Sequence, residues 1–194
     1  MDFNAPLGHI HTSVEGTVSY NSLLFIPEQT NAFADMRDPN KDYGPKLYVQ
    51  NVLILEHAKE LLPVWLRFVS WVVETTDLPL NISREMLQSN TTLETIKKSL
   101  IKKVLGELKK LRVKNPEGYA KFFENYGVIL KEWVYYEADI KQDIAANLEF
   151  DTLLGDKKIT LDEYLAASSL PGGENWEGDK TIYYITGKSR SEVL

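Results

Sequence analysis

The sequence contains no cysteine among its 194 residues, which excludes disulfide bonds and thiolate metal sites. Its first residues lack the basic segment and apolar run of a secretory signal peptide. No apolar stretch reaches the roughly 18 residues that a transmembrane helix requires. These absences predict a protein of the cytoplasm, or of a reducing organellar matrix after import, that has no membrane partner.

An excess of positive charge is missing as well. The formal net charge is −6 at pH 7. A molecule with this net charge does not attract the phosphates of a nucleic acid, so we expect no nucleic-acid partner. Hydrophobic residues make up 43% and charged residues 26% of the chain, which is ordinary for a globular protein. The length allows one full core, or one domain and part of another.

Residues 1–12 form a polar leader in the predicted organisation of the chain. Within it, His9 and His11 are spaced like side chains on one face of a strand and could chelate a metal ion. No further histidine or cysteine lies nearby in the sequence to complete such a site. We therefore interpret the leader as a flexible tail and predict no metal site.

Residues 13–130 are predicted to form a large, layered α/β/α subdomain. Val14–Pro27 is rich in β-forming residues, and Lys46–Leu55 is predicted to be a second core strand. Between them, Glu28–Pro45 has the Asn, Asp, Gly and Pro content of a long loop. Strands followed by helices indicate a mixed sheet covered by helices, in the mixed α/β class.

Besides the helix at Arg84 described below, three helices are expected within this subdomain. Pro63 suits the first turn of a helix through Glu74. Thr91 and Glu94 form a capping box for the second helix. Asn115-Pro116 ends that helix and begins the third. The residues predicted to be buried are Leu66, Val69 and Val73 in the first helix, Ile96, Leu100, Val104, Leu108 and Leu111 in the second, and Tyr119, Phe122, Phe123 and Tyr126 in the third.

Residues 131–170 are predicted to be a helical connector. It contains one helix marked by Ile140, Ile144 and Leu148, and another that a Thr160–Glu163 capping box begins. Residues 171–194 are expected to be a linker and the strand 181–186, the first of a truncated smaller α/β subdomain. Because a lone strand cannot bury itself, we expect the chain to be a fragment cut within that subdomain.

The second expected helix is strongly basic. Residues 92–114 carry eight lysines and arginines against two glutamates. A polyanion or an acidic client could dock there. The preferred interpretation is a solvated polar face opposite the apolar stripe, because the aromatic residues that single-stranded nucleic acid would require are missing from this helix.

The most informative motif is DLPLNISREMLQ, residues 77–88. Pro79 disfavours a helix at this point, and Asn81 and Ser83 are good N-cap residues for a helix that follows. Arg84 then places a permanently charged side chain with five donors in the first turn, which suits a phosphate. The alternative is that Arg84 pairs with a carboxylate such as Asp77 or Glu85, and spacing alone leaves both interpretations open.

Five blocks in order resemble the middle domain of the heat shock protein 90 family of ATP-dependent chaperones, most of all its bacterial high-temperature protein G or organellar branches. They are LLFIP (23–27), KLYVQNVLIL (46–55), DLPLNISREMLQSN (77–90), LKEW (130–133) and IYYITG (182–187). The resemblance extends from about Gly8 to the C-terminus. The DLPLNISREMLQ block is highly specific to that family.

The resemblance implies roles for individual residues. Arg84 matches the arginine that contacts the ATP γ-phosphate when the domains close, and Gln88 matches a glutamine that helps to hold the catalytic loop. Asn81 and Ser83 match the residues that position this loop. Phe33 matches an exposed apolar residue that faces the N-terminal domain. ATP and Mg²⁺ are expected to bind mainly in that separate domain, so the full-length parent should be an ATPase and this fragment inactive.

The resemblance also implies partners: the N-terminal nucleotide-binding domain, unfolded or partly folded client proteins, and a second copy in a homodimeric parent. Some positions depart from the family pattern. The usual Arg-Ala-Pro-Phe loop reads Gln29–Phe33, and Asn51 and Glu149 replace basic residues. Trp133 replaces a glycine and is expected to be an interdomain or client contact. These losses motivate an alternative function, a client-binding or partner-binding module whose parent has weak or no ATPase activity.

Overall fold

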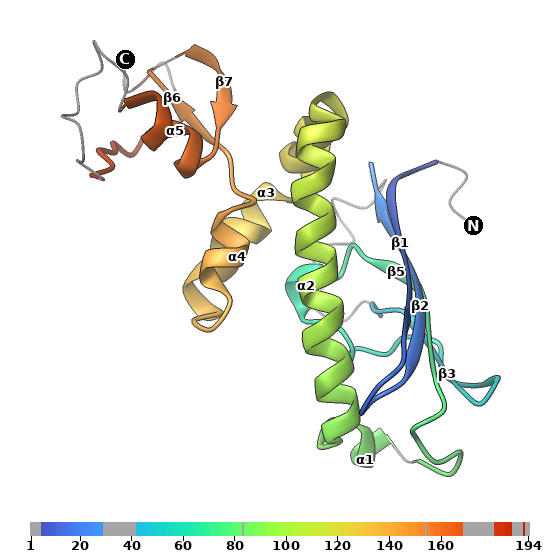
Figure 1. The fold of residues 1–194 in the computed structure, drawn as a ribbon. Helices are drawn as coiled ribbons and strands as arrows, with labels where there is room; N and C mark the ends of the chain where they lie inside the picture. Colours follow the sequence, from blue (N-terminus) through green and yellow to red (C-terminus); the bar gives the residue numbers. More distant parts are fainter. Residues whose placement is uncertain are drawn as a thin grey trace. The chain divides into compact units, whose positions relative to one another are not determined.

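The computed structural model describes residues 5–28, 42–82, 84–153, 155–168, 181–187 and 192 (Figure 1). The chain divides into two compact units, Met1–Ile129 and Leu130–Leu194. None of the helices in the described ranges combines the length and the apolar character needed to cross a bilayer. Each unit is considered by itself below.

The first unit is built on a five-stranded mixed sheet with the order β1-β2-β5-β3-β4. Its strands are β1 (Pro6–Val14), β2 (Tyr20–Pro27), β3 (Lys46–Val49), β4 (Val52–Leu55) and β5 (Ser70–Thr75). Neighbouring strands are antiparallel except β3 and β5, which are parallel. The predicted mixed α/β class with a mixed sheet is therefore confirmed.

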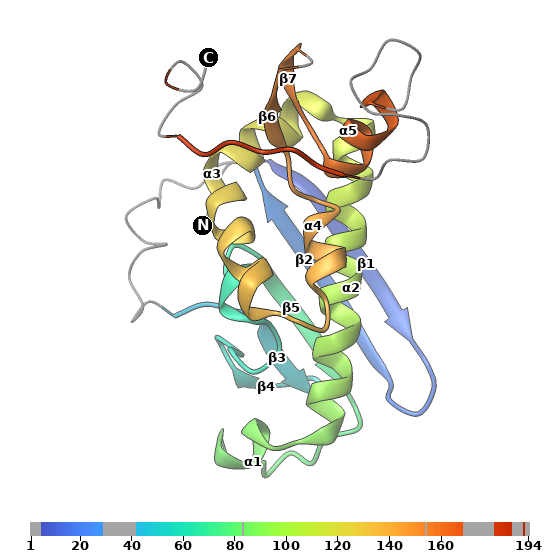
Figure 2. The same cartoon turned by 90° about the vertical axis from the view of Figure 1, so that its left-hand side faces the viewer.

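Two long helices, α2 (Thr91–Lys114) and α3 (Pro116–Tyr136), accompany this sheet. In both views α2 runs along one face of the sheet (Figures 1 and 2). The inward side chains of β2 alternate along the strand and are all buried: Tyr20, Ser22, Leu24 and Ile26. The Tyr20 hydroxyl donates a hydrogen bond to Ser99 Oγ on α2 at 2.7 Å, and burial raises the pKa of this tyrosine. Alternation with period two thus gives the sheet one core face.

The helical periodicity of α2 is confirmed, because all five residues of its predicted apolar stripe are buried. The four aromatic residues predicted for the first half of α3 are buried too. The predicted capping box at Thr91 is wrong. Asn90 is the N-cap, and its side chain accepts a hydrogen bond from the Leu93 backbone N–H at 3.2 Å. Asparagine is an equally good cap, so the prediction was displaced by one residue.

The described part of the predicted leader, residues 5–12, is not a flexible tail. Residues 6–14 form β1, which pairs antiparallel with β2 from Pro6↔Pro27 to Val14↔Tyr20. Period-two alternation was present in this segment, with Ile10 buried between exposed His9 and His11. One buried apolar position, Ile10, was too weak a pattern to predict a strand before the pairing with β2 was known.

The predicted single strand Lys46–Leu55 is a hairpin of β3 and β4. Its turn residues, Gln50 and Asn51, have φ values of 48° and 66°, as a tight type I′ turn requires. Asparagine tolerates this left-handed conformation better than most residues. Asn51, which replaces a basic residue of the family pattern, is therefore one of the two turn residues of this hairpin.

The predicted helix from Pro63 to Glu74 is wrong as well. The short 3-10 helix η2 (Val64–Leu66) is followed by β5, the central strand of the sheet. Leu66, Val69 and Val73 are buried as expected, but they are not on one helical face. The β-branched residues of the segment 69–76 prefer a strand, and β2 and β3 provide hydrogen-bond partners on both sides.

Trp71 in β5 has a backbone conformation that is costly for its side chain. Its φ is 107°, and the indole is 56% exposed while its ring meets Phe25 edge-on at 4.7 Å. Such a φ favours glycine, and a bulky residue held there costs about 1–3 kcal/mol. The strand therefore stores strain at an exposed aromatic residue.

We expect Trp71→Gly to leave the free energy of unfolding within about 1 kcal/mol of the original, although it deletes an indole. Relief of strain offsets the lost ring contact, about 0.5–1.5 kcal/mol, and the entropy cost of glycine, about 1 kcal/mol. Trp71→Ala keeps the strain and should be less stable than Trp71→Gly. Urea unfolding followed by circular dichroism measures both, and an alanine variant more stable than the glycine variant would contradict the assignment.

The second unit contains the end of α3, two further helices and a hairpin. These elements are α4 (Lys141–Ala145), β6 (Phe150–Thr152), β7 (Gly155–Ile159) and α5 (Leu161–Ser168). The predicted Thr160–Glu163 capping box is confirmed. The Thr160 N–H donates to Glu163 Oε2 at 2.9 Å, and the Glu163 N–H donates to Thr160 Oγ1 at 3.3 Å.

The predicted strand at 181–186 is wrong, since residues 181–187 have no regular secondary structure. Tyr183, Tyr184 and Ile185 are 69%, 85% and 72% exposed. Among the described residues, no other strand pairs with this segment, so its β-forming side chains have no ladder to join. The predicted linker at 171–180 lies outside the described residues.

Candidate functional site

The loop after β5 begins at a hydrogen-bonded anchor. The Ser19 backbone N–H donates to Asp77 Oδ2 at 2.6 Å, and Thr75 Oγ1 donates to the Ser19 carbonyl at 2.7 Å. The Asp77 N–H in turn donates to Thr75 Oγ1 at 3.1 Å. Thr75 is the last residue of β5, the central strand of the sheet, and it is only 1% exposed. The network therefore ties the start of the loop to the residue that precedes β2.

Three apolar side chains hold the rest of the loop against the first unit. Leu78, Ile82 and Leu87 are 2%, 8% and 2% exposed. A turn between them is closed by the Ile82 N–H, which donates to the Pro79 carbonyl at 3.3 Å. Asn81, one of the predicted positioning residues, is exposed at this turn. The loop is thus packed against the first unit and hydrogen-bonded to it.

The helix that follows, α1 (Arg84–Gln88), has only five residues. Arg84 is its first residue and Gln88 its last, so both lie on one short helix directly after the anchored turn, as predicted. A helix this short aligns few peptide dipoles, so attraction to a phosphate would come from the Arg84 charge itself. Ser83 lies outside the described residues, as do the side chains of Arg84 and Gln88.

Two apolar side chains that sequence reasoning missed flank this position. Leu80 is 48% exposed and Met86 is 55% exposed, on either side of Arg84 in the sequence. All four of these positions are apolar in the sequence, so only burial in the structure separates the exposed Leu80 and Met86 from the anchors Ile82 and Leu87. Exposed apolar side chains near one another in the chain are candidates for a contact with another domain or protein.

A second candidate site lies at the end of α3 in the second unit. The predicted contact residue Trp133 is half-buried, and its ring lies 5.4 Å from that of Tyr136. Tyr135 and Tyr136 are 85% and 63% exposed, and their rings meet edge-on at 5.2 Å. Sequence reasoning named only the tryptophan, although the run Trp-Val-Tyr-Tyr was visible. Clustered exposed aromatic residues are the usual core of a protein-binding surface.

The acidic and histidine side chains of the described residues include no group of three or more that could hold a metal ion. Phe33, the other predicted contact residue, lies outside the described residues.

Comparisons with known proteins bear on the fold and the family of the chain. The structure resembles the middle domain of a Plasmodium falciparum heat shock protein, with a TM-score of 0.75 and 29% identity over 97% of this chain and 69% of that one. This likeness defines the fold as that of a chaperone middle domain.

The sequence comparisons agree. The family model described as Hsp90 protein matches residues 1–194, so the chain belongs to the Hsp90 protein family. It is similar to the chaperone protein HtpG of Francisella tularensis subsp. novicida, with 46% identity over 191 residues, and to that of Campylobacter jejuni, with 41% identity over 190 residues. The chain spans about 29% of the Francisella protein and about 30% of the Campylobacter protein.

Proposed function

We propose that this chain acts as the middle domain of an ATP-dependent chaperone and presents Arg84 to ATP held by an N-terminal domain. The observation that supports the proposal is the anchored loop: the hydrogen bond to Asp77 and the buried side chains of Leu78 and Ile82 fix the chain as far as Ile82, two residues before the arginine. The exposed apolar side chains of Leu80 and Met86 provide a rim on which a closing domain could pack.

In this proposal Arg84 stabilises negative charge that develops on the transferred phosphoryl group. A positioned guanidinium acts in this way in phosphoryl transfer, because its charge is in place before the reaction begins. Gln88, one turn further on, steadies the loop, and Asn81 and Ser83 position it. ATP and Mg²⁺ belong to the N-terminal domain, which also contains the general base. Dimerisation and a cytoplasmic location of the parent are parts of the same proposal.

The exposed aromatic cluster of Trp133, Tyr135 and Tyr136 favours a second function, the binding of unfolded or partly folded clients. Its rings would cover apolar client side chains, as aromatic residues do in protein interfaces. Lys131 precedes Trp133 by two residues in the sequence. Its pKa is lowered, first by burial and then by the neighbouring Lys158. Its ammonium lies 4.6 Å from the centre of the Phe150 ring. Without the arginine role, this surface alone would define a non-catalytic binding module.

Mixing the chain with the purified nucleotide-binding domain of a related HtpG protein separates the two functions. We expect ATP hydrolysis by that domain to increase as the chain is added, and we expect no hydrolysis by the chain alone. The measurement is steady-state phosphate release at saturating ATP. Binding of an unfolded client without any stimulation would support the binding-module alternative and contradict the catalytic role.

A further inference from the structure

The outer edge of β1 is an open strand edge. β1 is the terminal strand of the five-stranded sheet, and among the described residues no strand pairs with its outer side (Figure 2). It has nine residues, which corresponds to about 30 Å of backbone with outward-pointing N–H and C=O groups. Soluble proteins usually protect such an edge with lysine or another charged residue in the strand. The segment PLGHIHTSV contains no lysine, arginine, aspartate or glutamate, and Pro6 and the irregular pairing between Pro6 and Gly8 protect only its first residues.

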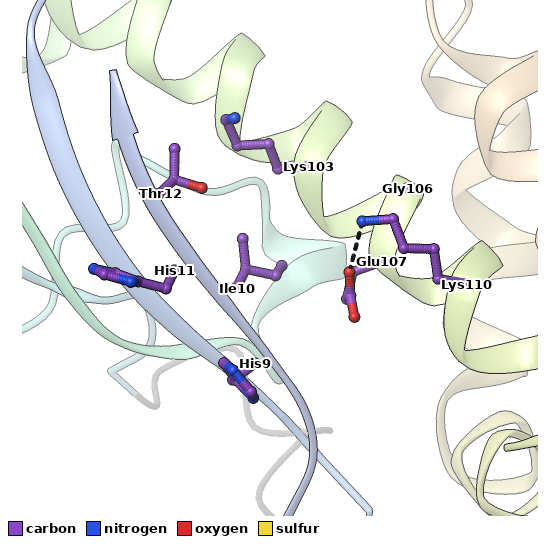
Figure 3. Close-up of a pocket in the computed structure, with 8 residues that line it drawn as sticks. All are labelled: His9, Ile10, His11, Thr12, Lys103, Gly106, Glu107 and Lys110. Carbon is purple, nitrogen blue, oxygen red and sulfur yellow. Dashed lines mark hydrogen bonds and ion pairs between the residues drawn. The ribbon is translucent and has the colours of Figure 1, made fainter. Parts of the chain in front are cut away.

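A hollow of about 380 Å³ lies along this edge. Four consecutive residues of β1, residues 9–12, line it together with Lys103, Gly106, Glu107 and Lys110 of α2 (Figure 3). Consecutive residues of a strand point to opposite faces, so a hollow lined by all four of them reaches the backbone of the strand as well as the side chains of one face. The hollow therefore exposes the part of β1 to which a further strand would bind.

The α2 side of the hollow carries two lysines and one glutamate, so its net charge is positive. Lys110 is 64% exposed and pairs with Glu107 at 3.1 Å. Among the described residues, no carboxylate lies within ion-pair distance of Lys103. Gly106, between the two lysines, has nothing within 4 Å of the position that a Cβ would occupy, so the helix leaves room there. The charge of this wall is opposite to the net charge of the chain, which is −6.

We propose that the β1 edge binds an extended acidic segment of a partner protein as an added sixth strand. The backbone of the segment would pair with β1, as in other cases of strand addition. Its carboxylates, on the side that faces α2, would pair with Lys103 and Lys110. The two lysines are seven residues apart, or about 10.5 Å along the helix, which acidic residues at alternate positions of a strand can reach with flexible side chains.

This interaction is independent of Arg84 and of ATP, so its failure would leave the proposed function untouched. The probe is a dye-labelled nine-residue peptide in which glutamate alternates with threonine, titrated with the 194-residue chain in fluorescence anisotropy. We expect saturable binding, together with slower amide hydrogen exchange in residues 6–14 on binding. A peptide with lysine in place of glutamate, and one with alternate amides N-methylated, should bind at least tenfold more weakly.

The chain offers a matched control for the lysines. Lys103→Glu/Lys110→Glu should weaken binding at least about tenfold, because two attractions become repulsions. Lys102→Glu/Lys109→Glu has the same spacing on the same helix and the same change in net charge, but neither residue lines the hollow. We expect this control to change the affinity less than threefold.

A third variant tests occupancy of the hollow without loss of charge. Gly106→Gln should weaken binding by filling the space, and it should keep or raise the melting temperature, because glycine is a poor helix former. Equal loss of affinity in the two lysine pairs, or full binding of the N-methylated peptide, would overturn the proposal. Self-association through β1, or stronger competition by heparin than by the acidic peptide, would identify a second copy or a polyanion as the occupant and would also overturn it.

Discussion

Replacing Arg84 by alanine should lower ATP turnover about 100-fold in a protein that joins the nucleotide-binding domain to this chain. Removal of one preorganised charge-stabilising donor typically costs about 10²–10³ in kcat. The nucleotide is held by the other domain, so the affinity for ATP should change much less than kcat. Steady-state kinetics measured over a range of ATP concentrations separates the two effects.

Arg84→Lys should recover only part of the activity, because an ammonium retains the charge but loses the planar, bidentate geometry of the guanidinium. Gln88→Ala should reduce turnover less than Arg84→Ala. Lys102→Ala is a suitable control, since it removes one exposed positive charge from the same unit, away from the loop. Unchanged turnover in Arg84→Ala, in a variant that melts at the original temperature, would eliminate the proposed mechanism.

Phe122→Ala should destabilise the first unit by about 3–5 kcal/mol, which is the usual cost of deleting a fully buried phenyl ring. Phe122 is completely buried in α3, and three aromatic rings surround it. Its ring centre lies 5.1 Å from that of Phe68, 4.9 Å from that of Tyr126 and 5.8 Å from that of Tyr119. The Phe68 contact joins the helix to the segment that leads into β5, so we expect the loss to extend to the strand that precedes the loop at Asp77–Ile82.

The measurement is urea unfolding followed by circular dichroism and by tryptophan fluorescence. Phe122→Leu keeps most of the apolar volume and should cost about 1.5 kcal/mol or less. Val128→Ala on the same helix, where the valine is 72% exposed, should stay within about 0.5 kcal/mol of the original. If Phe122→Ala unfolded at the same urea concentration as Val128→Ala, the aromatic cluster would not be the core of this unit.

Local interactions explain where sequence reasoning succeeded. The α2 stripe, the aromatic residues of α3 and the Thr160–Glu163 capping box depend on residues three or four positions apart, so their pattern is complete within one segment. The helix boundary at Asn115-Pro116 is equally local: α2 ends at Lys114 and α3 begins at Pro116. A loop before Arg84 was also indicated by its own residues, through Pro79, whereas the cap role of Asn81 and Ser83 stays a prediction.

Apart from the cap that is displaced by one residue and the hairpin of β3 and β4, the wrong predictions concern segments whose hydrogen-bond partners are remote. Residues 70–75 became the central strand because β2 and β3 pair with them on both sides, and their spacing of apolar residues also fits a helix. Residues 6–14 became a strand through pairing with β2, and residues 181–187 lack a strand partner in the described part of the chain. A strand needs a neighbour to satisfy its backbone, so its existence is decided by tertiary structure.

By itself the sequence determined the family resemblance, the helical core of the first unit and the position of Arg84 directly after a stiff loop. Tertiary structure alone decided how that loop is held, because Ser19 and Asp77 are 58 residues apart and meet only when β2 and β5 pair. It also decided that the first residues form an open strand edge beside Lys103 and Lys110. In both cases the deciding contacts join distant parts of the chain, and no local pattern of residue types specifies them.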